Sequence, residues 1–92
     1  MKFEWDEEKC QANIDKHGLS FADAWIVFAN ETLTFPDDRE NYGGKRFITL
    51  GNLVGRIVVV VHAQREEFTR IISMRKANAR ERKIYQERLG QN

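Results

Sequence analysis

Residues 56–77 read RIVVVVHAQREEFTRIISMRKA, and this stretch decides the fold. The run from Ile57 to Val61 is aliphatic at every position, so a strand here is apolar on both faces. Such a strand must be covered on both sides, which places it at the centre of a sheet. Glu66 and Glu67 mark a tight turn, and residues 68–74 form the next strand. We therefore predict two central strands, over residues 56–64 and 68–74.

The segments that precede these two strands add further strands. Residues 45–50 lead into a turn-rich connection over residues 51–55, which is typical of a hairpin. Residues 32–35 favour a strand that Pro36 stops, and the polar residues 37–44, with a Gly-Gly pair, predict an exposed loop. Residues 2–5 alternate polar and apolar side chains, which predicts a short first strand.

Two helices are predicted in the N-terminal half from their capping residues. Asp6 is a favourable N-cap for a helix over residues 6–17, and Gly18 is a natural stop. Ser20 begins a second helix that extends to about Asn30. Its apolar positions recur at helical spacing and predict the buried face, which is Phe21, Ala24, Trp25 and Phe28.

A last helix is predicted after the central strands. Asn78 is its N-cap with Glu81 three residues later, and it extends to about Leu89 before Gly90. The fold class is then α+β in the order β-α-α-β-β-β-β-α, with an antiparallel sheet, two N-terminal helices and one C-terminal helix. No repeat or linker interrupts the pattern, so residues 1–92 form a single domain.

Composition excludes several classes of protein. The 92 residues contain one cysteine, which excludes an internal disulfide framework and a multi-cysteine metal site. His17 and His62 stand far apart without metal-ligand spacing, so we expect no metal and no cofactor. The longest aliphatic run is five residues, and the N-terminus is acidic. Neither a membrane span nor a signal peptide is indicated, and we expect a cytoplasmic protein.

The net charge of +1 conceals a strong asymmetry along the chain. Residues 1–43 contain ten acids and four bases, whereas residues 44–92 contain four acids and eleven bases. Such an asymmetry favours a polyanion-binding face or a charged partner. The alternative is that the two halves interleave in space and neutralise each other.

A series of basic residues on the central strands and the last helix is the strongest candidate site. Regular alternation puts Arg70 on one face of its strand and Arg75 on the opposite face. Metal-free RNA cleavage needs cationic donors for the phosphoryl oxygens together with an acid and a base. Arginines, a glutamate, a tyrosine and a histidine meet that inventory, and the candidate catalytic residues are Arg65, Arg70, Arg75, Glu81 and Tyr85. The alternatives are salt bridges for the arginines and a packing role for Tyr85.

Other polar residues are candidates for RNA binding. Lys16 and His17 lie at a helix C-terminus, where they either contact a phosphate or serve as capping residues. His62 lies near a strand end and is either an acid–base group or a packed histidine at the edge of the core. The remaining candidates are Arg56, Arg80 and Arg82.

Two groups of residues resemble the BrnT family of toxins, and together they cover essentially the whole chain. The first is Phe3-Glu4-Trp5-Asp6 with Lys9, Asn13, Lys16-His17-Gly18, Ser20-Phe21 and Ala24. The second is Gly55-Arg56, Arg65, and Arg70-Ile71-Ile72-Ser73-Met74-Arg75-Lys76-Ala77 with Glu81 and Tyr85. Family members often have threonine in place of His62 and alanine in place of Met74, so no catalytic role is inherited by His62.

The resemblance implies a RelE-like fold and metal-independent RNA cleavage that arrests translation. It also implies a cognate BrnA-like antitoxin, which neutralises the toxin and connects it to DNA only indirectly. On this reading the chain is the toxin of a type II toxin–antitoxin system. The alternative function is a non-catalytic subunit that uses the same basic face to bind nucleic acid or the antitoxin.

Overall fold

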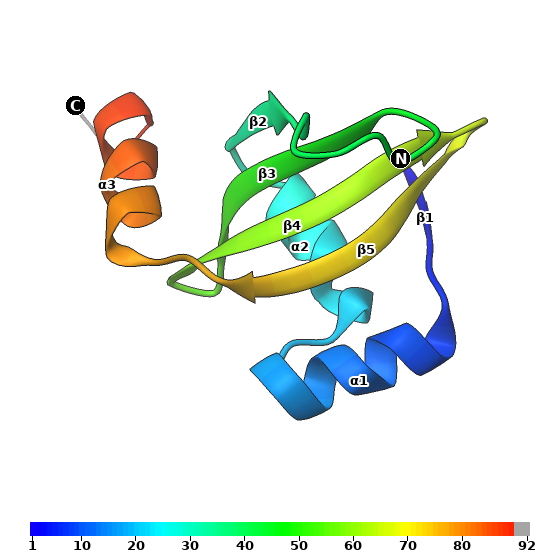
Figure 1. The fold of residues 1–92 in the computed structure, drawn as a ribbon. Helices are drawn as coiled ribbons and strands as arrows, with labels where there is room; N and C mark the ends of the chain where they lie inside the picture. The colour runs from blue at the N-terminus through cyan, green and yellow to red at the C-terminus, as the bar shows by residue number, and fades with distance from the viewer. Residues whose placement is uncertain (90–92) are drawn as a thin grey trace.

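The computed structural model describes residues 1–89 and shows a five-stranded sheet with helices packed against it (Figure 1). The strands lie in the order β1-β5-β4-β3-β2. Their bounds are β1 (Lys2–Glu4), β2 (Thr32–Pro36), β3 (Arg46–Leu53), β4 (Arg56–Arg65) and β5 (Phe68–Lys76). The predicted central position of residues 57–61 is confirmed, because β4 lies in the middle of the sheet and Val58, Val59, Val60 and Val61 are all buried. The predicted stop at Gly90 lies outside the described residues.

The prediction of a wholly antiparallel sheet is wrong, because β1 lies parallel to β5 and the sheet is mixed. The other three pairs of neighbouring strands are antiparallel. A three-residue strand joined to its neighbour through no hairpin gives no signal of its direction. β1 is placed by its packing: Phe3 lies against Phe28 with ring centroids 5.6 Å apart.

The predicted caps of the first helix are confirmed in α1 (Glu7–His17). Asp6 accepts hydrogen bonds from the backbone N–H groups of Glu8 and Lys9, which satisfies two donors at the helix start. Gly18 ends the helix in the left-handed region at φ 72°, a conformation that glycine adopts without a Cβ clash. The helix is therefore fixed at both ends by local sequence.

The segment predicted as one second helix divides into a 3-10 turn, η1 (Phe21–Asp23), and a short helix, α2 (Ala24–Phe28). The helical order therefore differs from the expected pair of N-terminal α-helices. A 3-10 turn has three residues per turn, so side chains three positions apart align. Phe21, Ala24 and Val27 consequently form the buried face, whereas Trp25, predicted to be buried, is 60% exposed.

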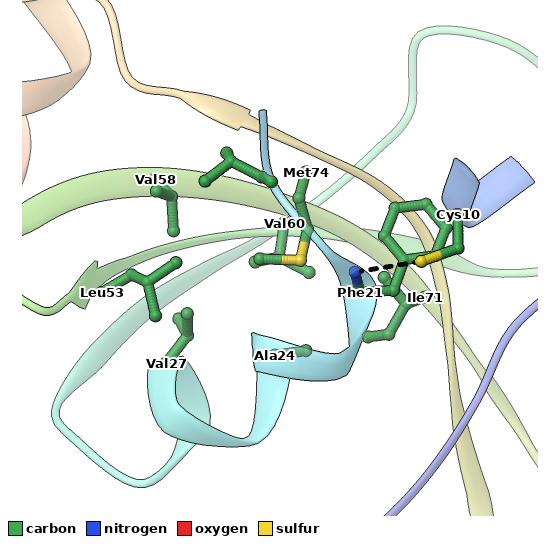
Figure 2. Packing of buried hydrophobic residues seen from close by; sticks show 10 residues of the cluster. Cys10, Phe21, Ala24, Val27, Leu53, Val58, Val60, Ile71 and Met74 are labelled. Carbon is green, nitrogen blue, oxygen red and sulfur yellow. Dashed lines mark hydrogen bonds between the residues drawn. The ribbon is translucent and has the colours of Figure 1, made fainter. Parts of the chain in front are cut away.

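The main core lies between the sheet and the N-terminal helices (Figure 2). Val58 and Val60 of β4 face Val27 and Ala24 of α2, while Met74 of β5 fills the space between them. Cys10 belongs to this core, and its sulfur accepts a hydrogen bond from the backbone N–H of Phe21 at 3.4 Å. The cysteine is thus a packing residue that joins α1 to η1.

The opposite face of the sheet carries a second, smaller core. Leu50, Val59 and Ala77 are buried there, and Ile84 and Tyr85 of α3 (Ala79–Arg88) pack against them. The predicted cap of α3 is confirmed: Asn78 and Glu81 form a reciprocal capping box. α3 stands at one end of the sheet, and the loop between β2 and β3 runs over the other end (Figure 1). The face between them carries the arginines described next.

Candidate functional site

A bulge in β5 places Arg70 and Arg75 on the same face of the sheet. Val61 pairs with Ser73 and His62 pairs with Ile71, so Ile72 is an extra residue without a partner on β4. One extra residue reverses the alternation of side chains beyond it. Arg70 pairs with Ala63 and Arg75 with Val59, and these two partners share one face. The prediction that the two arginines point to opposite faces is wrong for this reason.

Arg75 is held by a carboxylate of α3. Its Nη1 and Nη2 donate to Glu81 Oε1 and Oε2, both at 2.8 Å. Glu81 Oε1 also accepts from the backbone N–H of Asn78 at 2.9 Å, so the capping box fixes the carboxylate that orients the guanidinium. The hydrogen bond from Arg75 keeps the pKa of Glu81 below its ordinary value, and Glu81 in turn raises the pKa of Arg75. Glu81 is thus an ionised carboxylate at neutral pH.

Arg65 and Arg70 share a single carboxylate at the edge of the sheet. Glu4 Oε2 lies 3.3 Å from Arg70 Nη1 and 3.9 Å from Arg65 Nε. One acid facing two bases leaves a local excess of positive charge. Arg65 is 63% exposed and Arg70 is 31% exposed, so both guanidinium groups have access to solvent.

A basic cleft of about 470 Å³ lies beside this pair of arginines. Register explains its shape: Arg46, Ala63 and Arg70 lie in one row across β3, β4 and β5, and the small side chain of Ala63 leaves a hollow between two long ones. Among the described residues, five bases and no acid line the cleft. Its lining is Lys9, Tyr42, Gly43, Gly44, Lys45, Arg46, Ala63, Gln64, Arg65, Arg70 and Ile72.

The cleft also contains residues that were not among the predicted site residues. Arg46 begins β3 and Lys45 directly precedes it, and Tyr42 lies in the preceding loop, which was predicted only as an exposed connection. Adjacent bases directly after a Gly-Gly pair were the available signal. Lys9 reaches the cleft from α1, a placement that depends on tertiary structure alone.

The loop after β2 is anchored by a buried carboxylate, contrary to the prediction that all of residues 37–44 are exposed. The side chain of Asp37 is fully buried and accepts from Arg39 Nε and Nη2, both at 2.7 Å. Hydrogen bonding from Arg39 lowers the pKa of Asp37. Arg46 Nε lies 3.9 Å from the same carboxylate. Asp37 therefore ties the loop to the first residue of β3.

His62 lies in the core rather than at an RNA-binding surface. Its Nε2 is 2.7 Å from Thr49 Oγ1, and its ring packs between Phe28 and Phe47. The side chain faces α2, and burial lowers its pKa to about 4. The structure supports the packing interpretation of His62, because the residue is 8% exposed and its ring lies between Phe28 and Phe47.

Tyr85 also lies outside the cleft that Arg65 and Arg70 line. Its hydroxyl donates to the backbone carbonyl of Glu31 at 3.1 Å, and its ring packs in the second core. It borders a hollow with Ile26 and Val54, which is distinct from the cleft that Arg65 and Arg70 line. This placement supports the packing alternative for Tyr85.

The other predicted RNA-binding residues lie in three places. Lys16 and His17 occupy the last turn of α1, in the helical layer that covers the opposite face of the sheet. Arg56 and Arg82 line a hollow of about 460 Å³ between the β3–β4 turn and α3. Arg80 is exposed in the first turn of α3. The structure therefore does not join these residues to Arg65 and Arg70 in one cleft.

A family model described as the ribonuclease toxin BrnT of type II toxin–antitoxin systems matches residues 5–81. The chain belongs to the BrnT family. The resemblance stated from sequence is confirmed, and with it the function of a ribonuclease toxin in a type II toxin–antitoxin system, whose partner is an antitoxin. The matched range includes Arg65, Arg70, Arg75 and Glu81 and ends before Tyr85. A search among curated proteins finds no match.

Two further properties of this BrnT-family chain concern its described residues. Within residues 1–89, no three or more histidine, cysteine, aspartate or glutamate side chains gather in a way that could hold a metal ion. Over the same residues, every helix is too short or too polar to cross a membrane.

Proposed function

We propose that this BrnT-family chain is a metal-independent endoribonuclease whose RNA substrate lies across the face of the sheet that carries Arg65, Arg70 and Arg75. Cleavage of RNA in the cytoplasm would arrest translation, and a RelE-like fold would provide the scaffold. The observation that carries the proposal is the bulge at Ile72, which brings Arg70 and Arg75 to one face. Arginines are suited to this task because a guanidinium binds phosphate oxygens in pairs.

The proposed reaction is transfer of the phosphoryl group to the neighbouring 2′ oxygen of the RNA. The 2′ hydroxyl loses its proton and bonds to phosphorus, and the bond from phosphorus to the 5′ oxygen breaks. The 5′ oxygen takes up a proton, which leaves a 2′,3′-cyclic phosphate on the other fragment. Negative charge grows on the non-bridging oxygens during this step, and fixed cationic donors stabilise it. Alignment of the 2′ oxygen with the leaving oxygen supplies a further part of the rate.

Glu81 acts in this proposal by positioning Arg75. A general base works best with a pKa near the working pH, whereas Arg75 holds the pKa of Glu81 below its ordinary value. The ionised carboxylate is therefore a weak proton acceptor and a strong partner for the guanidinium. His62 is buried on the other side of β4, and the Tyr85 hydroxyl donates a hydrogen bond to the backbone carbonyl of Glu31, so neither is assigned to the reaction.

The test is cleavage of single-stranded RNA by the purified chain in the presence of EDTA. We expect fragments that end in a 2′,3′-cyclic phosphate and no cleavage when the scissile nucleotide lacks its 2′ hydroxyl. Arg75→Ala should lower kcat by about 100-fold or more, because one donor to the transition state is lost. Arg88→Ala is the matched control, since this exposed arginine lies at the far end of α3.

Three outcomes would contradict the proposal. Activity abolished by EDTA and restored by a divalent cation would show metal dependence. Undiminished cleavage by Arg75→Ala would remove Arg75 from the site. Salt-sensitive RNA binding without any product would favour the non-catalytic binding subunit instead.

The antitoxin completes the proposed system. We infer a BrnA-like partner that covers basic surface of the toxin and through which the toxin reaches DNA only indirectly. Co-expression with that partner should restore growth of cells arrested by the toxin, and the purified complex should release RNase activity when the antitoxin is removed. Growth that continues when the toxin is induced alone would contradict an active toxin.

A further inference from the structure

Tyr42 and Arg46 form a stacked pair at the wall of the basic cleft. The Arg46 guanidinium carbon lies 3.7 Å from the centre of the Tyr42 ring, which is close contact between two flat conjugated groups. Arg46 occupies the same row across the sheet as Ala63 and Arg70. The pair therefore faces the same hollow as the phosphate-binding arginines.

Arg46 is held at the wall of the cleft by stacking and charge, and not through a hydrogen bond of its Nε. In the described part of the chain, Arg46 Nε is buried and has no hydrogen-bond partner. Its nearest acid is Asp37 at 3.9 Å, and that carboxylate already accepts two hydrogen bonds from Arg39 at 2.7 Å. A ligand in the cleft cannot reach the buried Nε, whereas the Arg46 side chain as a whole is 22% exposed. Stacking on Tyr42 and the charge of Asp37 hold this side chain beside the cleft.

The composition of the cleft identifies the kind of ligand. Lys45, Arg65 and Arg70 supply positive charge, while Ala63 and Ile72 supply an apolar surface. Its volume of about 470 Å³ falls in the range of small-molecule sites. Planar aromatic surface beside cationic groups is the combination that binds unpaired bases of single-stranded RNA. A duplex keeps its bases stacked inside and offers only its backbone to such a site.

We propose that Tyr42 and Arg46 form a stacking surface for one unpaired base of the RNA substrate, next to the phosphate held by Arg70. This inference rests on the proposed function and adds a base-binding subsite to it. Stacking on the pair fixes the nucleotide beside the scissile phosphate. The site therefore requires single-stranded RNA at this position.

The experiment compares two uncleavable oligonucleotides of equal length and charge. One is a short single-stranded RNA with 2′-O-methyl groups throughout, and the other has the same backbone without bases. The wild-type chain should bind the first more tightly, by roughly tenfold, as expected for one stacked base. Tyr42→Ala should remove that preference, while Tyr42→Phe should retain it because the ring remains. Ala63→Leu should also weaken binding of the first oligonucleotide, since it fills the hollow and leaves every charge in place.

The outcomes separate this inference from the proposed function. Equal affinity of the wild type for both oligonucleotides would overturn the stacking surface and leave the phosphate-binding arginines intact. Failure to bind either oligonucleotide would overturn both proposals. If Tyr42→Ala binds RNA as the wild type does but loses affinity for the antitoxin, the pair belongs to the antitoxin interface and the inference is wrong. Because the wild-type comparison needs no variant, misfolding of Tyr42→Ala would leave the test decisive.

Discussion

At the scale of single residues, the guanidinium of Arg75 is bound by a carboxylate and, in the proposed reaction, also binds a phosphate. Glu81 binds it through two hydrogen bonds of 2.8 Å, so RNA competes with Glu81 for the same donors. Glu81→Gln removes the competing charge and keeps an oxygen for the capping box. We expect KM to fall and kcat to fall as well, each by roughly fivefold, because binding is easier and Arg75 is held less firmly.

The control for this prediction is Glu87→Gln, which removes an exposed carboxylate from the same helix. Steady-state cleavage of a fluorescent RNA measures both constants for the three proteins. An unchanged kcat for Glu81→Gln would show that the glutamate does not position Arg75, and an increase in KM would show that it helps to bind RNA directly.

His62 should make the stability of the fold depend on pH. Burial lowers its pKa from 6.5 to about 4, so the folded state disfavours the protonated ring. The unfolded chain takes up a proton below about pH 6.5, and the free energy of unfolding therefore falls as the pH drops toward 4. Above pH 6.5 the contribution of the neutral His62 ring to the free energy of unfolding is fully present. The total change in that free energy between this pH and a pH below 4 is about 3 kcal/mol.

Urea unfolding at several pH values checks this prediction. His62→Gln should unfold more easily at pH 7.5, but its free energy of unfolding should change less between about pH 7 and about pH 4.5. All other groups are common to both proteins and cancel in the comparison. Equal pH dependence in the two proteins would contradict the assignment of the effect to His62.

The sequence could predict some of the site residues and not others. Arg70, Arg75 and Glu81 could be predicted from the sequence. The two arginines are charged residues in an otherwise apolar strand pattern, and Glu81 occupies a capping position at a helix start. Tyr42 and Arg46 could not be predicted, because their stacking depends on the loop that the buried Asp37 carboxylate holds against β3. A buried aspartate in a polar loop looks the same in sequence as an exposed one.

At the scale of secondary-structure elements, the packing of α2 on β3 depends on a glycine. A Cβ built on Gly51 would lie 2.5 Å from Val27 Cγ1, a methyl group of a fully buried side chain. Gly51→Ala must therefore push α2 away from the sheet, and we expect a loss of roughly 1–3 kcal/mol in the free energy of unfolding. Gly44→Ala is the control, because a Cβ at that position meets no atom within 4 Å. Thermal or urea unfolding of the two variants measures the difference, and equal stability would contradict the close approach.

The elements themselves differ in how well the sequence predicts them. Helix starts were predicted correctly where one side chain caps the helix, as Asp6 and Asn78 do. The bulge in β5 was missed because Ile71 and Ile72 are adjacent and equally apolar, so the alternation of β5 can be continued in either phase. In the observed alternation both Ile71 and Met74 are buried in the main core, and Arg75 therefore lies on the same face as Arg70.

At the scale of the whole molecule, the two oppositely charged halves of the chain meet in space. Glu4 from the acidic half pairs with Arg65 and Arg70 from the basic half, and Lys2 pairs with Glu67. The acidic and basic halves of the chain, which could either separate or neutralise each other in space, therefore neutralise each other in part. The neutralisation is incomplete at the cleft, where five bases lie without a lining acid. Binding of a polyanion should accordingly be local rather than spread over the surface.

Local binding can be separated from general attraction by its dependence on salt. Each phosphate contact with a single strand lowers the logarithm of the binding constant by about 0.7 per tenfold increase in salt. If Arg65, Arg70 and Arg75 each bind one phosphate, the slope should be roughly −2. Arg70→Ala should reduce its magnitude by about 0.7, whereas Arg88→Ala, with the same change in net charge, should leave it unchanged. Fluorescence anisotropy of an uncleavable RNA measures these slopes. Equal reductions by the two variants would show that net charge, and not the face of the sheet, attracts RNA.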